Sequence, residues 1–394
     1  MQPTSTQPGW PVALPAAVPL ALHVLFATPH VSLLAKVLTG IVATAVPLAA
    51  TYAVDAHHYR FPTPTWDAVV AWATRRSHDN PFSHVTPLNL LAYNFLGGSS
   101  DLYGVEPATY YLRNAALQLN VLLPLAIFAP VVVALAARST RVDVAAALAA
   151  AAPFPLWFGL LSRIPHKEER FLYVVYPAAH VGGGLALALL PDAAASVLPV
   201  AWRGLRRVAK SLVAVAAAVL LLTFAVLSMS RVAALRVHYG ASIDVYAHLP
   251  PTAAGPVCVH TEWHTFPGSL HLPPAARLAF LRPPGGAKGP LMPLPFEDTW
   301  TRGRPFNDRN EEVPEQYLAD PAACAYLVVR VADDSDVAEA AADAGVNPVA
   351  RVLASLPYCN AGATPAWARA LFVPRVTEPR IVWDRYVLAE LARA

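Results

Sequence analysis

Residues 211–230 read SLVAVAAAVLLLTFAVLSMS, a run of twenty residues without a charge. The hydrocarbon core of a bilayer is about 30 Å thick, and about 20 consecutive apolar residues in a helix cross it. Cations lie at both ends of the run: Arg203, Arg206, Arg207 and Lys210 before it and Arg231 after it. A charged side chain at the bilayer centre costs at least about 2.5 kcal/mol, so these charges mark the ends of a membrane-spanning helix.

Working outward from this run, five more stretches with at most one charge approach spanning length. They are Val12–Thr28, Val31–Val54, Ala115–Ala137, Val144–Ser162 and Phe171–Pro191. The first is short and contains Pro15 and Pro19, and Ala193–Val200 is too short to span and is expected to be interfacial. The sequence therefore predicts a polytopic α-helical membrane protein with six spanning helices.

The distribution of charge divides the chain into two parts. Residues 1–235 hold 15 basic and 9 acidic side chains, whereas residues 236–394 hold 14 basic and 17 acidic ones in a shorter length. Short apolar strands such as Ala325–Val331 alternate with Pro-rich loops in the second part. We therefore expect a transmembrane region over residues 1–235 and a small α/β or β-rich domain over residues 236–394.

Composition excludes several classes of function. The chain is 56% hydrophobic and 14% charged, against about 25% charged in soluble domains. Its formal net charge of +3 is too balanced for a nucleic-acid binder, which needs a clustered basic face. Three cysteines form no disulfide framework, and no Cys-x-x-Cys or Cys/His cluster has zinc-site spacing. We expect neither nucleic acid nor a structural metal as a partner.

Loop cations set the orientation of the spans. Short cytoplasmic loops are enriched in Lys and Arg, which places residues 138–143 and 203–210 in the cytosol. The loops 55–114 and 163–170, with everything after Arg231, then lie on the lumenal side. Cys258 and Cys324 would share this oxidising side, so a disulfide is permitted; free buried thiols are an equal alternative, and Cys359 is left over.

The strongest chemical signal is the segment 163–173, RIPHKEERFLY. Its five consecutive ionisable residues, His166–Arg170, are costly at a membrane boundary unless they are paired or face a polar cavity. Such cations can hold a phosphate while the carboxylates orient hydroxyl groups. An interfacial turn with snorkelling cations is the alternative interpretation.

The string HKEERFL, ahead of a helix that contains Tyr176-Pro177, resembles the signature of glycosyltransferase family 22. These are multi-pass GT-C mannosyltransferases of the endoplasmic reticulum that use dolichyl-phosphate mannose, and the double-Glu form is most similar to the α-1,2 enzyme of N-glycan precursor assembly. Further similar segments are 55–59 (DAHHY), 90–96 (LLAYNFL), 100–112, 257–267 and 306–312. The resemblance runs from about Asp55 to Tyr386.

The resemblance implies an α-1,2-mannosyltransferase without metal or cofactor, located in the endoplasmic reticulum membrane. Its partners would be dolichyl-phosphate mannose as donor, the dolichol-linked oligosaccharide as acceptor, and the lipid bilayer. His166, Lys167 and Arg170 would hold the donor phosphate. The remaining substrate-binding candidates would shape the acceptor site: Glu168, Glu169, Asp101, Tyr103, Glu106, Asp55 and Tyr59. For the segment 102–107, a turn that starts a helix with Pro107 in its first turn is the structural alternative.

Two departures from the family bear on activity. Family members carry an acidic residue, the best candidate for the catalytic base, in their first lumenal loop, whereas the first acid here is Asp55. We therefore expect an N-terminally truncated form, and the identity of the catalytic residue stays unassigned. Residues 67–87 are expected to be an insertion, because Trp66 and Leu88 correspond to near-adjacent family positions. A glycosylphosphatidylinositol precursor as acceptor, or a non-catalytic membrane scaffold, remain open alternatives.

Overall fold

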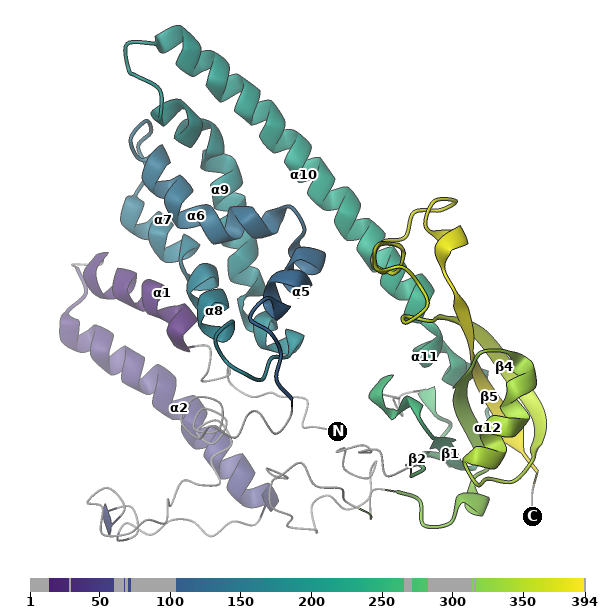
Figure 1. Cartoon of the computed structure of the whole chain (residues 1–394). Helices are drawn as coiled ribbons and strands as arrows, with labels where there is room; N and C mark the ends of the chain where they lie inside the picture. Colours follow the sequence, from purple (N-terminus) through teal and green to yellow (C-terminus); the bar gives the residue numbers. More distant parts are fainter. Residues whose placement is uncertain are drawn as a thin grey trace. The chain divides into compact units, whose positions relative to one another are not determined.

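The computed structural model describes residues 14–27, 30–59, 67, 70–71, 104–265, 271–282, 314 and 317–392. These residues form two compact units, one ending at Ser228 and the other beginning at Met229 (Figure 1). Most of the segment expected as an insertion, residues 67–87, lies outside the described residues.

The first unit is helical (Figure 1). Its helices are α1 (Leu14–Ala27), α2 (Leu33–Tyr59), α5 (Tyr110–Leu119), α6 (Leu122–Ala136), α7 (Val144–Ala151), α8 (Pro153–Leu161), the 3₁₀ helix η4 (Glu169–Val175), α9 (Tyr176–Ser196) and the first part of α10 (Arg203–Tyr239). The run at residues 211–230 lies inside α10, as the sequence predicts.

The described helices supply fewer spans than the six expected. Four are long and apolar enough to cross a membrane: Leu33–Val54, Val144–Leu161, Glu169–Ser196 and Arg203–Tyr239. The pair α5 and α6 adds a fifth if it counts as one span, although it is bent by 100°. For the first expected span, Val12–Thr28, the structure describes the 14 residues of α1, about 21 Å of helix at 1.5 Å per residue, and the other residues of that span lie outside the described ones.

Small residues bring α6 and α9 close together. Ala126, Ala129, Val133 and Ala186 are fully buried in this packing. A side chain at Gly183 would place its Cβ 2.5 Å from the Cδ1 of Leu122, so any larger residue at this crossing would force the Leu122 side chain to shift. Since lipid is as apolar as the helix surfaces, close backbone approach of this kind is a main source of helix association in membranes.

The two cation-rich loops meet at one end of this helical unit. Asp192 near the end of α9 accepts a hydrogen bond from Ser139 Oγ at its backbone oxygen (2.7 Å) and pairs with Lys210 Nζ at its carboxylate (2.7 Å). Asp143 caps α7 at the same loop, accepting from the Ala146 N–H at 3.1 Å. The segments 138–143 and 203–210 therefore share one end, which agrees with their expected placement on one side of the membrane.

The second unit is built on a five-stranded sheet with the order β2-β1-β3-β5-β4. The strands are β1 (Gly255–Val259), β2 (Ala276–Phe280), β3 (Tyr326–Val331), β4 (Val349–Cys359) and β5 (Trp383–Leu391). β1, β2 and β3 are parallel, and β5 is antiparallel to both of its neighbours. The strand expected at residues 325–331 is confirmed as β3.

Alternate residues of the central strands enter two separate cores. Val257 and Val259 of β1 pack with Tyr246 from η5 (Val245–His248), whereas Cys258 packs on the other face with Val337 and Ala341 from α12 (Val337–Asp343). Successive side chains of a strand point to opposite faces, so buried alternation of this kind requires cover on both sides. The unit is therefore a mixed sheet with helical segments against both faces.

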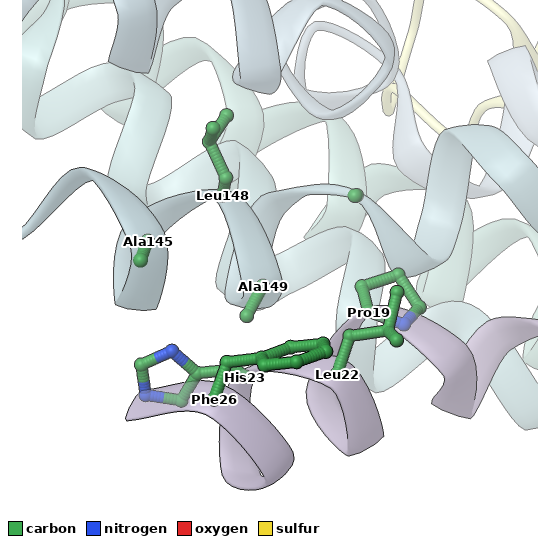
Figure 2. A pocket seen from close by; sticks show the side chains of 8 residues that line it. Pro19, Leu22, His23, Phe26, Ala145, Leu148 and Ala149 are labelled. Atoms are coloured by element: carbon green, nitrogen blue, oxygen red, sulfur yellow. The ribbon is translucent and has the colours of Figure 1, made fainter. Parts of the chain in front are cut away.

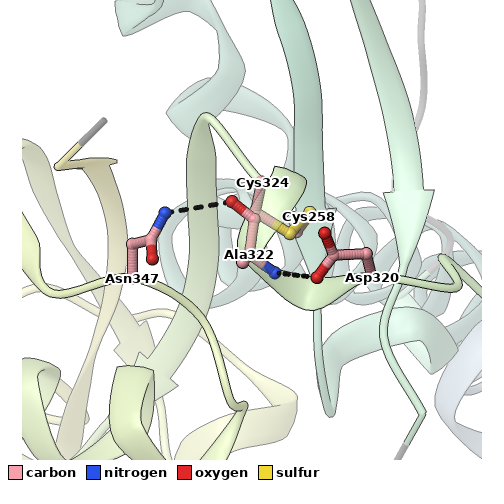
Figure 3. The surroundings of a disulfide bond; sticks show 5 residues. All are labelled: Cys258, Asp320, Ala322, Cys324 and Asn347. Carbon is pink, nitrogen blue, oxygen red and sulfur yellow. Dashed lines mark hydrogen bonds between the residues drawn. A yellow bond between two sulfur atoms is a disulfide. The ribbon is translucent and has the colours of Figure 1, made fainter. Parts of the chain in front are cut away.

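A disulfide joins Cys258 of β1 to Cys324, just before β3 (Figure 3). The neighbouring turn is fixed by Asp320, whose carboxylate accepts from the Ala322 N–H at 3.0 Å, and by Asn347, whose amide donates to the Ala322 carbonyl at 3.0 Å. Cys359 is a buried free thiol. Of the two alternatives open for Cys258 and Cys324, the structure has the disulfide.

Arg330 holds two acids at the carboxyl edge of β3. Its Nε lies 3.5 Å from the buried Glu262 Oε1 and 3.7 Å from Asp384 Oδ2. Arg330→Met takes a cation away from the buried Glu262 carboxylate, and we expect it to destabilise this unit by about 3 kcal/mol. Hydrogen exchange in the full chain measures this loss of stability, and we expect the amides of β3 and β5 to exchange faster in the variant.

The control is Arg351→Met. Arg351 forms an exposed ion pair with Glu390 at 2.9 Å, and exposed pairs contribute at most about 1 kcal/mol. Equal exchange rates in the two variants would contradict the structural role of Arg330.

Candidate functional site

The signature segment lies between α8 and α9. Pro165 prevents α8 from continuing, and helical structure begins again only at Glu169. α8 ends at Leu161, and Pro165 disfavours helical backbone at Ile164 and cannot continue the helix itself. The chain resumes at Glu169 as the 3₁₀ helix η4, and Trp157 Nε1 fastens it by donating to the Phe171 carbonyl at 3.1 Å. His166–Glu168 therefore form an irregular segment at one end of the bundle.

Lys167 ties this segment to the residues before α5. Its ammonium donates to the carbonyl of Glu106 at 2.8 Å and to that of Ile164 at 2.5 Å. The Glu106 N–H donates in turn to the Pro165 carbonyl at 3.0 Å. Only 5% of Lys167 is exposed, and this burial lowers the pKa of its ammonium, with the nearby Glu106 carboxylate acting in the opposite direction.

His166 adds a third connection between the same two segments. Its Nδ1 lies 3.1 Å from the Gly104 carbonyl, and its Nε2 lies 3.0 Å from Glu168 Oε1. Gly104 has φ of +101°, a backbone conformation that L side chains rarely adopt. We call the contacts of residues 104–106 with residues 165–167 the latch.

Glu168 and Arg170 form the exposed part of the site. Arg170 donates from Nη2 to Glu168 Oε1 at 2.9 Å and pairs through Nε with Glu168 Oε2. The side chain of Arg170 is 48% exposed, and its guanidinium lies 6.0 Å from the Phe171 ring centroid. Glu168 accepts from two of the five guanidinium N–H groups of Arg170, so the remaining N–H groups do not point at Glu168.

Glu169 is positioned by a residue that sequence reasoning missed. Gln118 Nε2 on α5 donates to Glu169 Oε1 at 2.7 Å. The signal available in the sequence was one of two amides, with Asn120, in the largely apolar stretch Ala115–Ala137, since polar groups at such positions usually have a specific partner.

The remaining expected site residues are less completely placed. Asp101 and Tyr103 lie outside the described residues, and Asp55 and Tyr59 lie in the last turns of α2, where side chains are not described. The exposed side chain of Glu106 adjoins the latch. Pro107 precedes α5 rather than lying in its first turn: the Tyr110 N–H donates to the Pro107 carbonyl at 2.9 Å, closing a turn before the helix.

The site thus combines three carboxylates, the cations Lys167 and Arg170, and the imidazole of His166 at the end of an apolar bundle. Lys167 and His166 are engaged by the protein, Arg170 is the most exposed cation, and Glu169 is oriented by Gln118. In the described part of the chain, no three His, Cys, Asp or Glu side chains come close enough to hold a metal ion. The arrangement is suited to binding an anion beside hydroxyl groups at a membrane surface.

A pocket of 440 Å³ lies elsewhere, between α1 and α7 (Figure 2). Leu22 and Phe26 of α1 and Leu148 of α7 line it, and His23 is its one titratable lining residue. None of His166–Arg170 contributes to it, so this apolar pocket is distinct from the signature segment.

Comparison with known proteins identifies the family. The family model described as the Alg9-like mannosyltransferase family matches residues 5–273, more than half of the chain and including the whole latch. The chain belongs to this family. The membership expected from the HKEERFL string is confirmed.

Relatives of this Alg9-like chain carry one activity in their names. It is 29% identical to alpha-1,2-mannosyltransferase ALG9 of Arabidopsis thaliana (96% of this chain, 61% of the relative) and of Mus musculus (98% and 62%). It is 31% identical to ALG9 of Homo sapiens over 79% of this chain and 53% of the relative. The chain thus spans about three fifths or less of the length of these relatives. No solved structure matches it.

Proposed function

We propose that the protein is an α-1,2-mannosyltransferase that moves mannose from dolichyl-phosphate mannose to the dolichol-linked oligosaccharide of N-glycosylation. The observation that carries this proposal is the latch, which holds the family's signature residues together at one end of a membrane-competent helical bundle. Membership in the Alg9-like family and the names of its relatives support the α-1,2 linkage.

The same proposal assigns a location to each part of the chain. Residues 1–235 form a GT-C-like region in the endoplasmic reticulum membrane, with lumenal loops at 55–114 and 163–170. Residues 236–394 form a lumenal domain. The Cys258–Cys324 disulfide supports this placement, because disulfides persist in oxidising compartments. The cation-rich loops that meet at Asp192 support a cytosolic position for the opposite end of the bundle.

The chemistry is an inverting displacement. A base removes the proton from the 2-hydroxyl of the acceptor mannose, and this oxygen attacks the anomeric carbon of the β-linked donor. The bond to the dolichyl phosphate oxygen breaks on the opposite face, the phosphate leaves with the electron pair, and an α-1,2 linkage results. The residue that acts as the base is not assigned.

The contacts suggest separate roles for the signature residues. Arg170 binds the donor phosphate with the guanidinium edge that Glu168 does not use, since planar guanidinium groups suit phosphate oxygens. Glu169, oriented by Gln118, accepts from a substrate hydroxyl. Lys167 and His166 support the site through the latch and leave little donor capacity for phosphate. Asp101, Tyr103, Glu106, Asp55 and Tyr59 contribute to the acceptor side.

A transfer assay tests this function. Membranes containing the chain should transfer mannose from dolichyl-phosphate mannose to the dolichol-linked oligosaccharide. Arg170→Gln should lower the rate roughly 50-fold, which corresponds to losing one charge-assisted hydrogen bond to phosphate.

The matched control is Arg163→Gln, an exposed cation of the same loop, which should transfer at the rate of the unaltered chain. Transfer to a glycosylphosphatidylinositol precursor instead would identify the other acceptor. Absence of transfer to either acceptor by the unaltered chain would favour the scaffold alternative and contradict the proposal.

A further inference from the structure

The second unit exposes a group of apolar side chains on one segment, residues 367–382, which we call the rim segment. Trp367 is 53% exposed, Val373 40%, Val376 58% and Val382 44%. The segment comprises α13 (Ala366–Ala370) from Trp367 on, a turn and the chain that leads into β5. An exposed tryptophan with three exposed valines within sixteen residues is more apolar surface than a water-facing loop ordinarily carries.

Hydrogen bonds fix this segment to α10 at the end of its uncharged run. Ser230 Oγ donates to the Phe372 carbonyl at 2.9 Å, and the Phe372 N–H donates to the Ser230 carbonyl at 3.1 Å. Arg231 Nη1 donates to the Ala370 carbonyl at 3.2 Å. Ser230 is the last residue of the run 211–230, and Arg231 is the first charge after it.

These contacts set the depth of the rim segment. A spanning helix places its terminal charges at the membrane–water boundary, so residues bonded to Ser230 and Arg231 lie at that boundary. One turn later, the buried Ala234 faces the same side, and His238 Nδ1 lies 3.1 Å from the Arg369 carbonyl. Ser230 and His238 are about 12 Å apart along the helix, at 1.5 Å per residue, so the segment follows α10 outward from the boundary.

The turn at the centre of the rim segment is internally fixed. Thr377 Oγ1 accepts from the Val373 N–H at 2.9 Å and donates to the Val373 carbonyl at 3.1 Å, and the Thr377 N–H donates to the same carbonyl at 3.0 Å. Arg375, with φ of +63°, lies at the tip beside the exposed Val376. Within this closed turn, Val373 and Val376 are exposed.

The charges of the segment complement lipid headgroups. It contains Arg369, Arg375 and Arg380 against the single acid Glu378. Tryptophan at the headgroup level, aliphatic side chains at the acyl boundary and arginines near lipid phosphates are the usual composition of interfacial segments.

We propose that the rim segment is a membrane-interface anchor of the second unit. Val373 and Val376 enter the boundary between headgroups and acyl chains, Trp367 lies at the headgroup level further along α10, and Arg375 and Arg380 bind lipid phosphates. With α10, the anchor gives the sheet unit two attachments to one leaflet and so fixes its depth. Only the assignment of that leaflet to the lumenal side rests on the proposed function.

Fluorescence quenching tests the anchor. The full chain with Val376→Cys, labelled with a small environment-sensitive fluorophore, is reconstituted into phosphatidylcholine vesicles that contain a spin-labelled phosphatidylcholine. The matched control is Val352→Cys on β4, a valine of the same unit that is 42% exposed. Cys359 is buried and so poorly accessible to the label. We expect a blue-shifted label at residue 376 that the lipid quencher reaches and aqueous iodide does not, with the reverse at residue 352.

Two results would overturn the anchor. If iodide quenches the labels at 376 and 352 equally and the lipid quencher reaches neither, the rim segment faces water. If the label at 376 is shielded from both quenchers, a protein partner covers it instead. Val373→Cys provides a second position on the same turn should labelling at 376 disturb folding. None of these readouts depends on mannose transfer, so failure of the anchor and failure of the proposed function are distinguishable.

Discussion

Replacing Lys167 with methionine is expected to lower the proposed mannose transfer by more than about 100-fold, because the latch loses the hydrogen bond from Lys167 to the Glu106 carbonyl. Methionine keeps the apolar stem but donates no hydrogen bond. The part-buried carbonyls of Glu106 and Ile164 then lose their common donor, at a cost of about 1 kcal/mol for each hydrogen bond. The Glu106–Pro165 and His166–Gly104 contacts then hold the two segments without Lys167, and we expect the glutamates and Arg170 to lose their fixed relative positions.

Hydrogen exchange separates this role from direct phosphate binding. If Lys167 acts through the latch, Lys167→Met should raise the exchange rate of the Glu106 amide, which donates to Pro165, together with the loss of transfer. Loss of transfer with an unchanged exchange rate would contradict the latch role. It would indicate instead that Lys167 binds the donor phosphate, as the family resemblance implied. The control is Lys210→Met, whose exposed pair with Asp192 lies at the opposite end of the bundle and should affect neither readout.

Removing the Cys258–Cys324 disulfide is expected to destabilise the second unit by about 4 kcal/mol. The two residues are 66 positions apart, and a loop of that length gives a cross-link of about this value through the entropy of the unfolded chain. Both sulfurs are buried against the α12 face of the sheet. The double variant Cys258→Ala with Cys324→Ala avoids leaving an unpaired thiol. The loss of stability is measured as the fall in the temperature at which a protease begins to cleave the second unit.

Cys359→Ala is the matched control for this experiment. Cys359 is equally buried but unbridged, so its replacement removes a small side chain without opening a loop. If the double variant resists proteolysis as well as Cys359→Ala does, the disulfide does not contribute to the stability of this unit.

The sequence was sufficient for features that depend on neighbouring residues. The uncharged run at 211–230 specifies a helix in α10 because its length and hydropathy match a bilayer. The short, nearly continuous apolar run of β3 is typical of a strand buried on both faces. HKEERFL identified the family because the string itself is specific. The first expected span, Val12–Thr28, stays a prediction, since only its residues in α1 are described.

Only the tertiary structure decided contacts between residues distant in the sequence. Lys167 reaches Glu106 across 61 positions, Gln118 reaches Glu169 across 51, and Ser230 reaches Phe372 across 142. Hydropathy and periodicity report the surroundings of a residue within a few turns, whereas these pairings depend on how helix ends and loops close on each other in space. The sequence therefore determined which residues form the membrane helices and carry the family signature, and the folded chain determined that Lys167 serves as a latch and that the rim segment lies at the end of α10.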